Sequence, residues 1–184
     1  MNQEQTLIQY DKELHACKDV FENKARDYGT SWRVLRSISI TDQIMIKALR
    51  IRNIQETGEQ KVEDRIDNEF QGIVNYGIIA LIQMDLPVEE QWELLTDEAV
   101  GRYEEKAAGV RELMLKKNHD YGEAWRKMSL HSLVDLILSK LQRIRRIIDR
   151  GGKTLVSEGI DANFADIINY AAFALIKLRE ERSS

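Results

Sequence analysis

The stretch KARDYGTSW, residues 24–32, returns as KNHDYGEAW at residues 117–125. Both copies follow the pattern Lys-x-x-Asp-Tyr-Gly-x-x-Trp, and the second copy starts 93 residues after the first. A pattern that returns at one fixed spacing indicates that a structural unit has been duplicated within the chain. The repeated stretch therefore predicts how the fold is organised before any single element is considered.

The identities between the two copies continue beyond this motif. At the spacing of 93 residues, Asp42, Ile44, Lys47, Arg50, Ile51 and Arg52 match Asp135, Ile137, Lys140, Arg143, Ile144 and Arg145. After one inserted residue near Gly151, the matches at a spacing of 94 are Asp67, Phe70, Ile73, Asn75, Tyr76, Ala80 and Leu81 with Asp161, Phe164, Ile167, Asn169, Tyr170, Ala174 and Leu175. We interpret residues 1–86 as a first helical repeat, 87–93 as a connector and 94–184 as a second repeat, packed together as one compact domain.

Each repeat is predicted to form three helices. Apolar residues three and four positions apart favour a helix over about residues 7–25, with Leu7, Tyr10, Leu14, Cys17 and Phe21 on one face. The same spacing of Val100, Tyr103, Ala107, Val110 and Met114 predicts its counterpart in the second repeat. The other expected helices cover about residues 41–56 and 62–84, then 133–150 and 160–180. Thr41 is predicted to cap its helix. Glycine readily adopts the left-handed conformation, so four glycines are predicted to end helices: Gly29, Gly58, Gly122 and Gly151.

The third helix of the second repeat is apolar on every side. Ala162, Ala165, Phe173 and Ile176 lie opposite Phe164, Ile167, Ile168, Ala171 and Leu175 on a helical wheel. A helix of this kind is buried all round, so we predict an all-α helical bundle with the third helices near its centre. The duplication makes the bundle an internal pseudo-dimer. Asp166 and Asn169 fall inside this helix, and a buried carboxylate needs a partner, a proton or a metal ion.

Composition and charge argue against several classes of protein. The formal net charge of −4 argues against nucleic acid as the main partner, because nonspecific binding depends on cations that neutralise many phosphates. Cys17 is the only cysteine, so the sequence has no disulfide framework. No apolar run reaches the ~18 residues of a membrane span. We expect a cytoplasmic protein with no membrane partner, and the sequence leaves open whether it forms a homo-oligomer.

Carboxylates three and four residues apart suggest a metal site. They are Glu158, Asp161 and Asp166 in the second repeat, and Glu63, Asp64, Asp67 and Glu69 in the first. This spacing places several carboxylates on one side of a helix, and Mg²⁺ prefers oxygen ligands completed by water and substrate phosphate. The alternative is a solvated helix start, where acidic residues favour the positive end of the helix dipole.

Basic and aromatic residues provide candidates for contacts with phosphate and with a planar ring. Two pairs share a helix face and suit phosphate binding, namely Lys47 with Arg50 and Lys140 with Arg143. A salt-bridged outer face is the alternative. The further candidates are Asp27, Trp32, Asp120 and Trp125 of the motif, and Asn75, Tyr76, Asn169 and Tyr170. A tryptophan here either stacks on a base or anchors a loop to the core.

Together these stretches resemble the nucleotide modification associated domain 1 family. The resemblance rests on Lys-x-x-Asp-Tyr-Gly-x-x-Trp, on Lys-x-x-Arg, and on EGIDANFADIINYA at residues 158–171, and it covers both halves. These small helical proteins are similar to the all-α nucleoside triphosphate pyrophosphohydrolases, the MazG-like and dimeric dUTPase-like enzymes. The resemblance implies that Mg²⁺ bridges the triphosphate and that water attacks the α-phosphorus, which releases pyrophosphate and the monophosphate.

The resemblance also implies site residues. Asp166 takes the place of the aspartate in the enzymes' Glu-x-x-Asp helix, with Asn163 in the place of the glutamate. In the first half, Glu69 keeps the glutamate and Gly72 replaces the aspartate. The implied Mg²⁺ ligands are Glu158, Asp161, Asp166 and Glu69, and the implied phosphate ligands are Lys47, Arg50, Lys140 and Arg143. Either the two halves complete one composite site or both sites have decayed.

Two hypotheses about function follow. The preferred one is Mg²⁺-dependent hydrolysis of a standard or modified nucleoside triphosphate to the monophosphate and pyrophosphate. The alternative is a noncatalytic nucleotide-binding or protein-interaction module, in which the duplication preserved the fold while the acidic residues drifted. A purely structural helical adaptor is a third interpretation, and it predicts no nucleotide binding.

Overall fold

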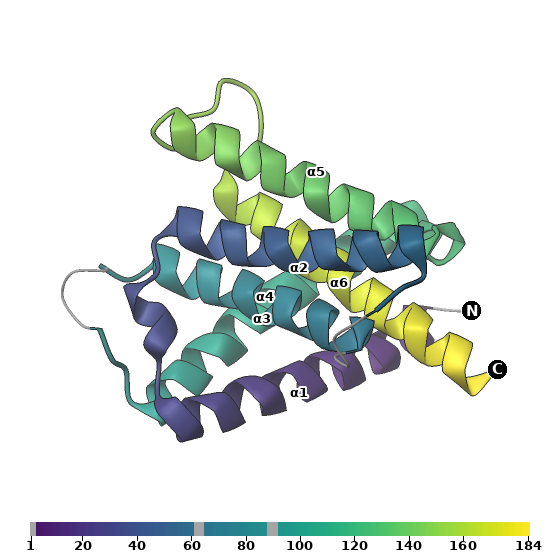
Figure 1. Ribbon diagram of the computed structural model, residues 1–184, viewed down its shortest axis with the longest axis horizontal. Coiled ribbons are helices and arrows are strands. Elements are labelled where there is room, and N and C mark those ends of the chain that lie inside the picture. Colours follow the sequence, from purple (N-terminus) through teal and green to yellow (C-terminus); the bar gives the residue numbers. More distant parts are fainter. Residues whose placement is uncertain (1–2, 61–64, 88–91) are drawn as a thin grey trace.

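The fold consists of six long α-helices (Figure 1). The computed structural model describes residues 3–60, 65–87 and 92–184. The helices are α1 (Gln3–Tyr28), α2 (Ser37–Thr57), α3 (Ile66–Met84), α4 (Thr96–Tyr121), α5 (Leu130–Asp149) and α6 (Ile160–Ser183). Two 3₁₀ turns, η1 (Ser31–Val34) and η2 (Ala124–Lys127), follow α1 and α4. The described residues form no strand, and the predicted all-α class is confirmed.

The helix boundaries differ from the prediction at the start of α2. Thr41 is not a cap, because it lies inside the helix and its hydroxyl donates to the carbonyl of Ser37 at 2.7 Å. A threonine can satisfy its hydroxyl in this way within a helix, so its cap preference does not decide the boundary. The predicted start of α3 at Val62 and residues 88–91 of the connector lie outside the described residues.

Glycines end the helices as predicted. Gly58 and Gly122 cap α2 and α4 with φ of 69° and 59°, and their amides donate to carbonyls four residues earlier. Gly29 directly follows α1 and Gly151 lies two residues after the end of α5, and both also have positive φ. Since the left-handed conformation costs glycine little, these positions set where the chain turns.

The two halves are related by a pseudo-twofold arrangement. Each helix packs against its own counterpart, α1 on α4, α2 on α5 and α3 on α6. Buried hydrogen bonds cross between the halves in matched pairs: Tyr10 donates to Asn169 at 2.8 Å, and Tyr103 donates to Asn75 at 2.7 Å. Ion pairs between the halves also come in matched sets. The pair Arg145–Asp42 between α5 and α2 is matched by Arg52–Asp135. The pair Arg111–Asp11 between α4 and α1 is matched by Lys18–Glu104. The predicted internal pseudo-dimer is therefore confirmed.

The core is centred on α3 and α6. Figure 1 shows α6, in yellow, crossing the middle of the bundle behind α2. Every residue from Asn163 to Ile176 is buried except Tyr170, which is half-buried. This burial on all sides explains why α6 has no polar face along this stretch, and it places Asp166 inside the protein. No helix of the described chain is both long and apolar enough to span a membrane.

Glu123 fixes the turn between α4 and η2. It is the one described residue other than glycine with a positive φ, 65°. Its carboxylate accepts hydrogen bonds from Thr6 at 2.6 Å, from Asn118 at 2.7 Å and from Arg126 at 2.7 Å. Burial raises the pKa of this carboxyl, but the three hydrogen bonds outweigh burial and leave its pKa below the ordinary value. The ionised carboxylate therefore ties the second motif loop to α1.

We expect Glu123→Gln to lower the free energy of unfolding by about 1–3 kcal/mol at pH 7, because charged hydrogen bonds are lost. The folded pKa of Glu123 lies below its unfolded value, so this contribution is complete above the unfolded value and disappears as the pH falls through the folded one. Urea unfolding at pH 7 and at pH 3 measures the difference, with Glu112→Gln on the exposed face of α4 as control. A deficit of equal size at both pH values would contradict the assignment.

Candidate functional site

The first half contains a cavity of about 760 Å³. It opens between the end of α1, η1, α2 and α3, so the motif loop forms one wall and the two following helices form the others. Its polar and aromatic lining includes Lys24, Tyr28, Ser31, Trp32, Gln43, Lys47, Asn68, Glu69, Gln71, Asn75 and Tyr76. A volume in the range of about 300–1,000 Å³ is typical of small-molecule sites.

The repeated motif contributes three side chains to this cavity. Lys24, Tyr28 and Trp32 all line it, since the helical spacing of the first two and the turn into η1 bring them to one side. Trp32 is 8% exposed and its ring centroid lies 6.1 Å from that of Phe21, so it anchors the loop as well as forming a wall. Asp27 is exposed and does not line the cavity.

The side chains from α2 and α3 form a charged corner. Arg50 donates to Glu69 at 2.9 Å, and the Lys47 ammonium lies 3.7 Å from the same carboxylate. Lys47 also lies 5.9 Å from the centre of the Tyr76 ring. Burial raises the pKa of Tyr76, so its hydroxyl stays protonated at neutral pH. Glu69 is the one carboxylate among the described residues that line the cavity.

Asn75 and Asn169 connect the helices of the core. Asn75 donates to the carbonyl of Cys17 at 3.0 Å and accepts the bond from Tyr103. Asn169 accepts the bond from Tyr10 and donates to the carbonyl of Val110 at 3.4 Å. Asn75 also lines the cavity, and its amide nitrogen and oxygen each make one of these hydrogen bonds in the core. The structure thus gives both asparagines structural contacts.

Two positions of this cavity carry larger side chains in the second half. Asp166, which stands where the first half has Gly72, accepts from Lys117 at 2.7 Å and from Lys140 at 2.9 Å. Phe173, the counterpart of Ile79, stacks on Trp125 with centroids 4.3 Å apart and planes 7° from parallel. The two halves share a fold but differ in the space behind the motif.

Asp166 has the partners that a buried carboxylate requires. Its side chain is only 7% exposed, and two lysine ammonium groups neutralise it. Burial lowers the pKa of Lys117, but the hydrogen bond and the charge of Asp166 outweigh burial and raise it above the ordinary value. Lys117 therefore carries charge at neutral pH. No function was predicted from the sequence for Lys117 or for its counterpart Lys24. Both begin a copy of the repeated motif, and this shared position could have identified them as site residues.

The implied Mg²⁺ ligands are not brought together. Asp166 pairs with Lys117 and Lys140, Glu69 pairs with Lys47 and Arg50, and each acid is thus neutralised within its own half. Glu158 and Asp161 are exposed at the start of α6. In the described part of the chain, no three Asp, Glu, His or Cys residues lie close enough to hold a metal ion. The described carboxylates do not fit Mg²⁺, and Glu63 and Asp64 lie outside the described residues.

The remaining candidates lie apart from the cavity. Asp67 pairs with Arg65 and Arg182, and Asp120 is exposed beside His119. Burial raises the pKa of Tyr170, which is half-buried near Asp166. Arg143 lines a different cleft, together with Glu158 and Asn163. Arg143 therefore lines that cleft, whereas Lys140 is bound to Asp166.

Comparison with protein families gives one match. The model of the family described as nucleotide modification associated domain 1 matches residues 24–84 and again residues 117–178. The two matches coincide with the two copies of the motif and the helices that follow each copy. No curated protein and no solved structure shows significant similarity to the chain.

Proposed function

The chain belongs to the nucleotide modification associated domain 1 family, and from this premise we propose that the cavity of its first half binds a nucleotide. The phosphates lie against Lys24 and Lys47, and the base lies against the aromatic walls formed by Tyr28, Trp32 and Tyr76. The single observation that carries this proposal is the carboxylate of Asp166 in the second half.

Asp166 marks the position of an anion between two lysines. Lys117 and Lys140 hold its carboxylate at 2.7 Å and 2.9 Å, and their counterparts in the first half are Lys24 and Lys47. Gly72 supplies no side chain there, so the first half keeps the lysines without the internal anion. A phosphate group from outside is the natural replacement, because lysine offers a point charge to a phosphate oxygen.

Lys47 needs only a side-chain movement to bind such a group. Its ammonium lies 3.7 Å from Glu69, beyond a normal hydrogen bond, and Arg50 remains paired with Glu69 when Lys47 leaves. No described residue forms an ion pair with Lys24. The cavity thus offers two cations and stacking surfaces, which suit the charged and planar parts of a nucleotide.

Binding without metal-dependent hydrolysis is the form of the proposal that the described residues support. A Mg²⁺ route requires several oxygen ligands at the triphosphate, and Glu69 is the one described carboxylate in the cavity. Glu69 is also bound to Arg50 at 2.9 Å. Metal-dependent hydrolysis is therefore the alternative that the experiment must distinguish from binding alone.

We expect calorimetry to detect nucleotide binding in the first-half cavity, equally with Mg²⁺ and with chelator, in a panel of standard and modified nucleoside mono-, di- and triphosphates. Lys24→Ala should weaken binding by about 10- to 100-fold, because a charged phosphate contact is lost. Lys116→Ala, on the exposed face of α4, is the control and should change affinity less than about twofold.

Chromatography of the same mixtures separates the alternatives. Recovery of intact nucleotide supports a binding protein. Release of monophosphate and pyrophosphate that a chelator blocks would instead establish the hydrolase. Absence of binding across the whole panel would leave the protein-interaction module and the structural adaptor as the remaining interpretations.

A further inference from the structure

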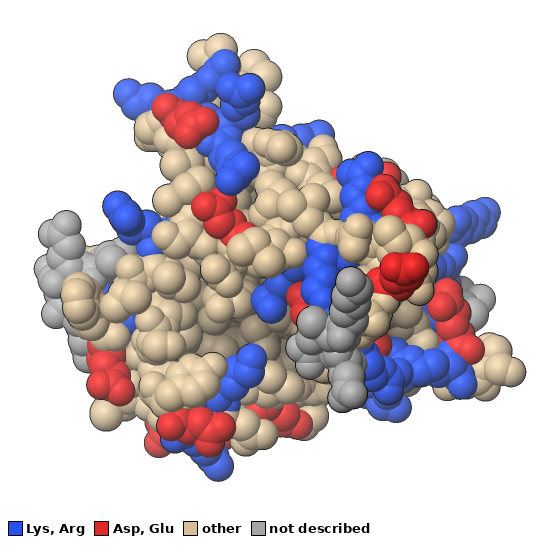
Figure 2. All heavy atoms as spheres, in the orientation of Figure 1, with Lys and Arg blue, Asp and Glu red and all other residues tan. Residues whose placement is uncertain are grey.

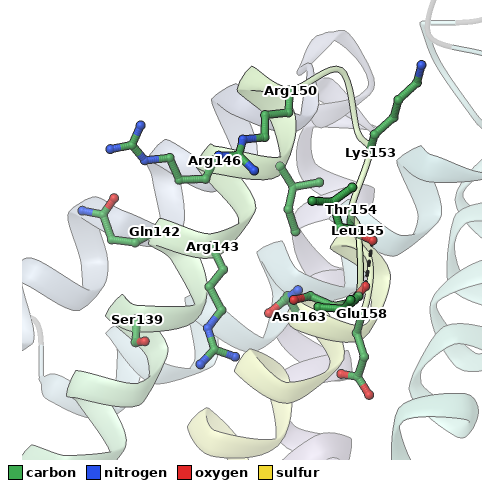
Figure 3. Close-up of a pocket in the computed structure, with 13 residues that line it drawn as sticks. Ser139, Gln142, Arg143, Arg146, Arg150, Lys153, Thr154, Leu155, Glu158 and Asn163 are labelled. Carbon is green, nitrogen blue, oxygen red and sulfur yellow. Dashed lines mark hydrogen bonds between the residues drawn. The ribbon is translucent and has the colours of Figure 1, made fainter.

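A second cleft lies in the other half, between the end of α5 and the start of α6. Its volume is about 960 Å³, and the loop over residues 150–159 forms one side (Figure 3). Arg143, Arg146 and Arg150 line it from α5, and Lys153 lines it from the loop. Figure 3 shows Arg143 pointing into the space between the two helices and Lys153 extending from the rim. Figure 2 shows basic residues gathered around this loop at the top of the view.

These cations are not neutralised within the described part of the chain. Arg143, Arg146, Arg150 and Lys153 form no ion pair with any described carboxylate. Glu158 is the one described acid in the lining, and Figure 3 shows its side chain directed away from the arginines. Like charges held close together repel one another, so an anion in the cleft would stabilise the arrangement.

The end of α5 explains only part of the cluster. Cations at the carboxyl end of a helix interact favourably with its dipole, and this effect accounts for Arg146 and Arg150. Arg143 lies further from the end, and Lys153 is outside the helix. The three arginines are spaced three and four residues apart, so they lie along one side of α5. Figure 3 shows Arg143 directed into the cleft and Arg146 extending outward beside it.

The cluster is specific to the second half. The first half has Asn53, Thr57 and Glu59 at the positions of Arg146, Arg150 and Lys153. Arg50, the counterpart of Arg143, is bound to Glu69, whereas the second half has Asn163 in place of that glutamate. Because the first half folds in the same way without these cations, the repeat does not need them for its structure.

We propose that this cleft binds the phosphate chain of a small polyphosphate, either free or carried by a nucleotide. Guanidinium groups bind phosphate oxygens through paired hydrogen bonds, and a row of three on one helix face matches a chain of linked phosphates. The concave shape and the net charge of −4 favour a small ligand over the long backbone of a nucleic acid. The cleft is separate from the first-half cavity lined by Lys24, Tyr28 and Trp32, and this proposal does not depend on nucleotide binding there.

The test uses the full chain carrying Gly72→Asp, which places a carboxylate at the lysines of the first-half cavity so that only the cleft is measured. Inorganic triphosphate is titrated by calorimetry at two salt concentrations. The double variant Arg146→Asn with Arg150→Thr introduces the residues of the first half, which this fold accommodates. Affinity should fall about 30-fold or more, since two charged contacts are lost.

A charge-matched control separates local contacts from long-range attraction. Lys116→Asn with Lys127→Thr removes the same charge from exposed positions, and it should change affinity less than about threefold. An equal fall in both double variants, or no binding of triphosphate to the parent, would overturn the proposal. A single-stranded oligonucleotide that binds the cleft more tightly than triphosphate would also overturn it.

The source of the phosphates is decided by a second ligand. Equal affinities for inorganic triphosphate and a nucleoside triphosphate support recognition of the phosphate chain alone. Tighter binding of the nucleoside triphosphate supports a nucleotide as the ligand. Its base would lie beside Leu155 and Val156, which are 95% and 97% exposed on the loop.

Discussion

Replacing Gly72 with aspartate is expected to weaken nucleotide binding in the first half by at least about 100-fold, because a carboxylate at the phosphate position repels the ligand and takes its lysines. The change copies Asp166, which Lys117 and Lys140 already hold in the second half. A Cβ at Gly72 would lie 2.8 Å from Cε of Lys47. That atom belongs to a flexible side chain, so Lys47 can turn toward the new carboxylate and the fold should remain intact.

Gly72→Asn is the matched control for this prediction. It adds nearly the same volume without the negative charge, so it should weaken binding much less than the aspartate. Calorimetry gives the affinities, and thermal unfolding shows whether both variants are folded. Unchanged nucleotide affinity in a folded Gly72→Asp protein would contradict the proposed phosphate position.

Asp166→Asn is expected to lower the free energy of unfolding by about 2–4 kcal/mol. Breaking a fully buried ion pair by removing one partner costs about 3–5 kcal/mol, and the loss is smaller here because Lys117 is 43% exposed. Lys140, only 13% exposed, would be left with an uncompensated charge. Inorganic phosphate should restore part of the stability, since it can replace the carboxylate between the two lysines.

Urea unfolding with and without phosphate measures this effect. Asp161→Asn, at an exposed position of the same helix, is the control and should change stability by less than about 0.5 kcal/mol. The metal-ligand hypothesis for Asp166 makes the opposite prediction, because removal of a carboxylate from an empty acidic site relieves repulsion. A stabilised Asp166→Asn protein would therefore contradict the ion-pair account.

The duplication and the helical class could be predicted because they depend on patterns along the chain. The two motif copies and the apolar spacing specify the repeats, and the glycines specify where four helices end. The start of α2 could not be predicted, because Thr41 can bond to Ser37 within a helix as readily as it can cap one. Local preference leaves such a boundary undecided.

The chemistry of the site was harder to predict than the fold. The sequence identified Asp166 as a buried carboxylate that needed a partner, but its partner Lys117 lies 49 residues earlier on α4. A metal, a proton and a distant lysine satisfy the same requirement, and only the packing of α4 and α5 against α6 decides between them. The difference between the cavities likewise depends on how Phe173 packs on Trp125.

The most direct test is a crystal structure of the full chain with a bound nucleoside triphosphate and Mg²⁺. We expect one nucleotide in the first half, with phosphate oxygens at Lys24 and Lys47 above Gly72 and the base against Trp32 or Tyr76. The Asp166 carboxylate should remain between its two lysines. A metal ion bound by Asp166, or a nucleotide in the second half with the first cavity empty, would contradict the account.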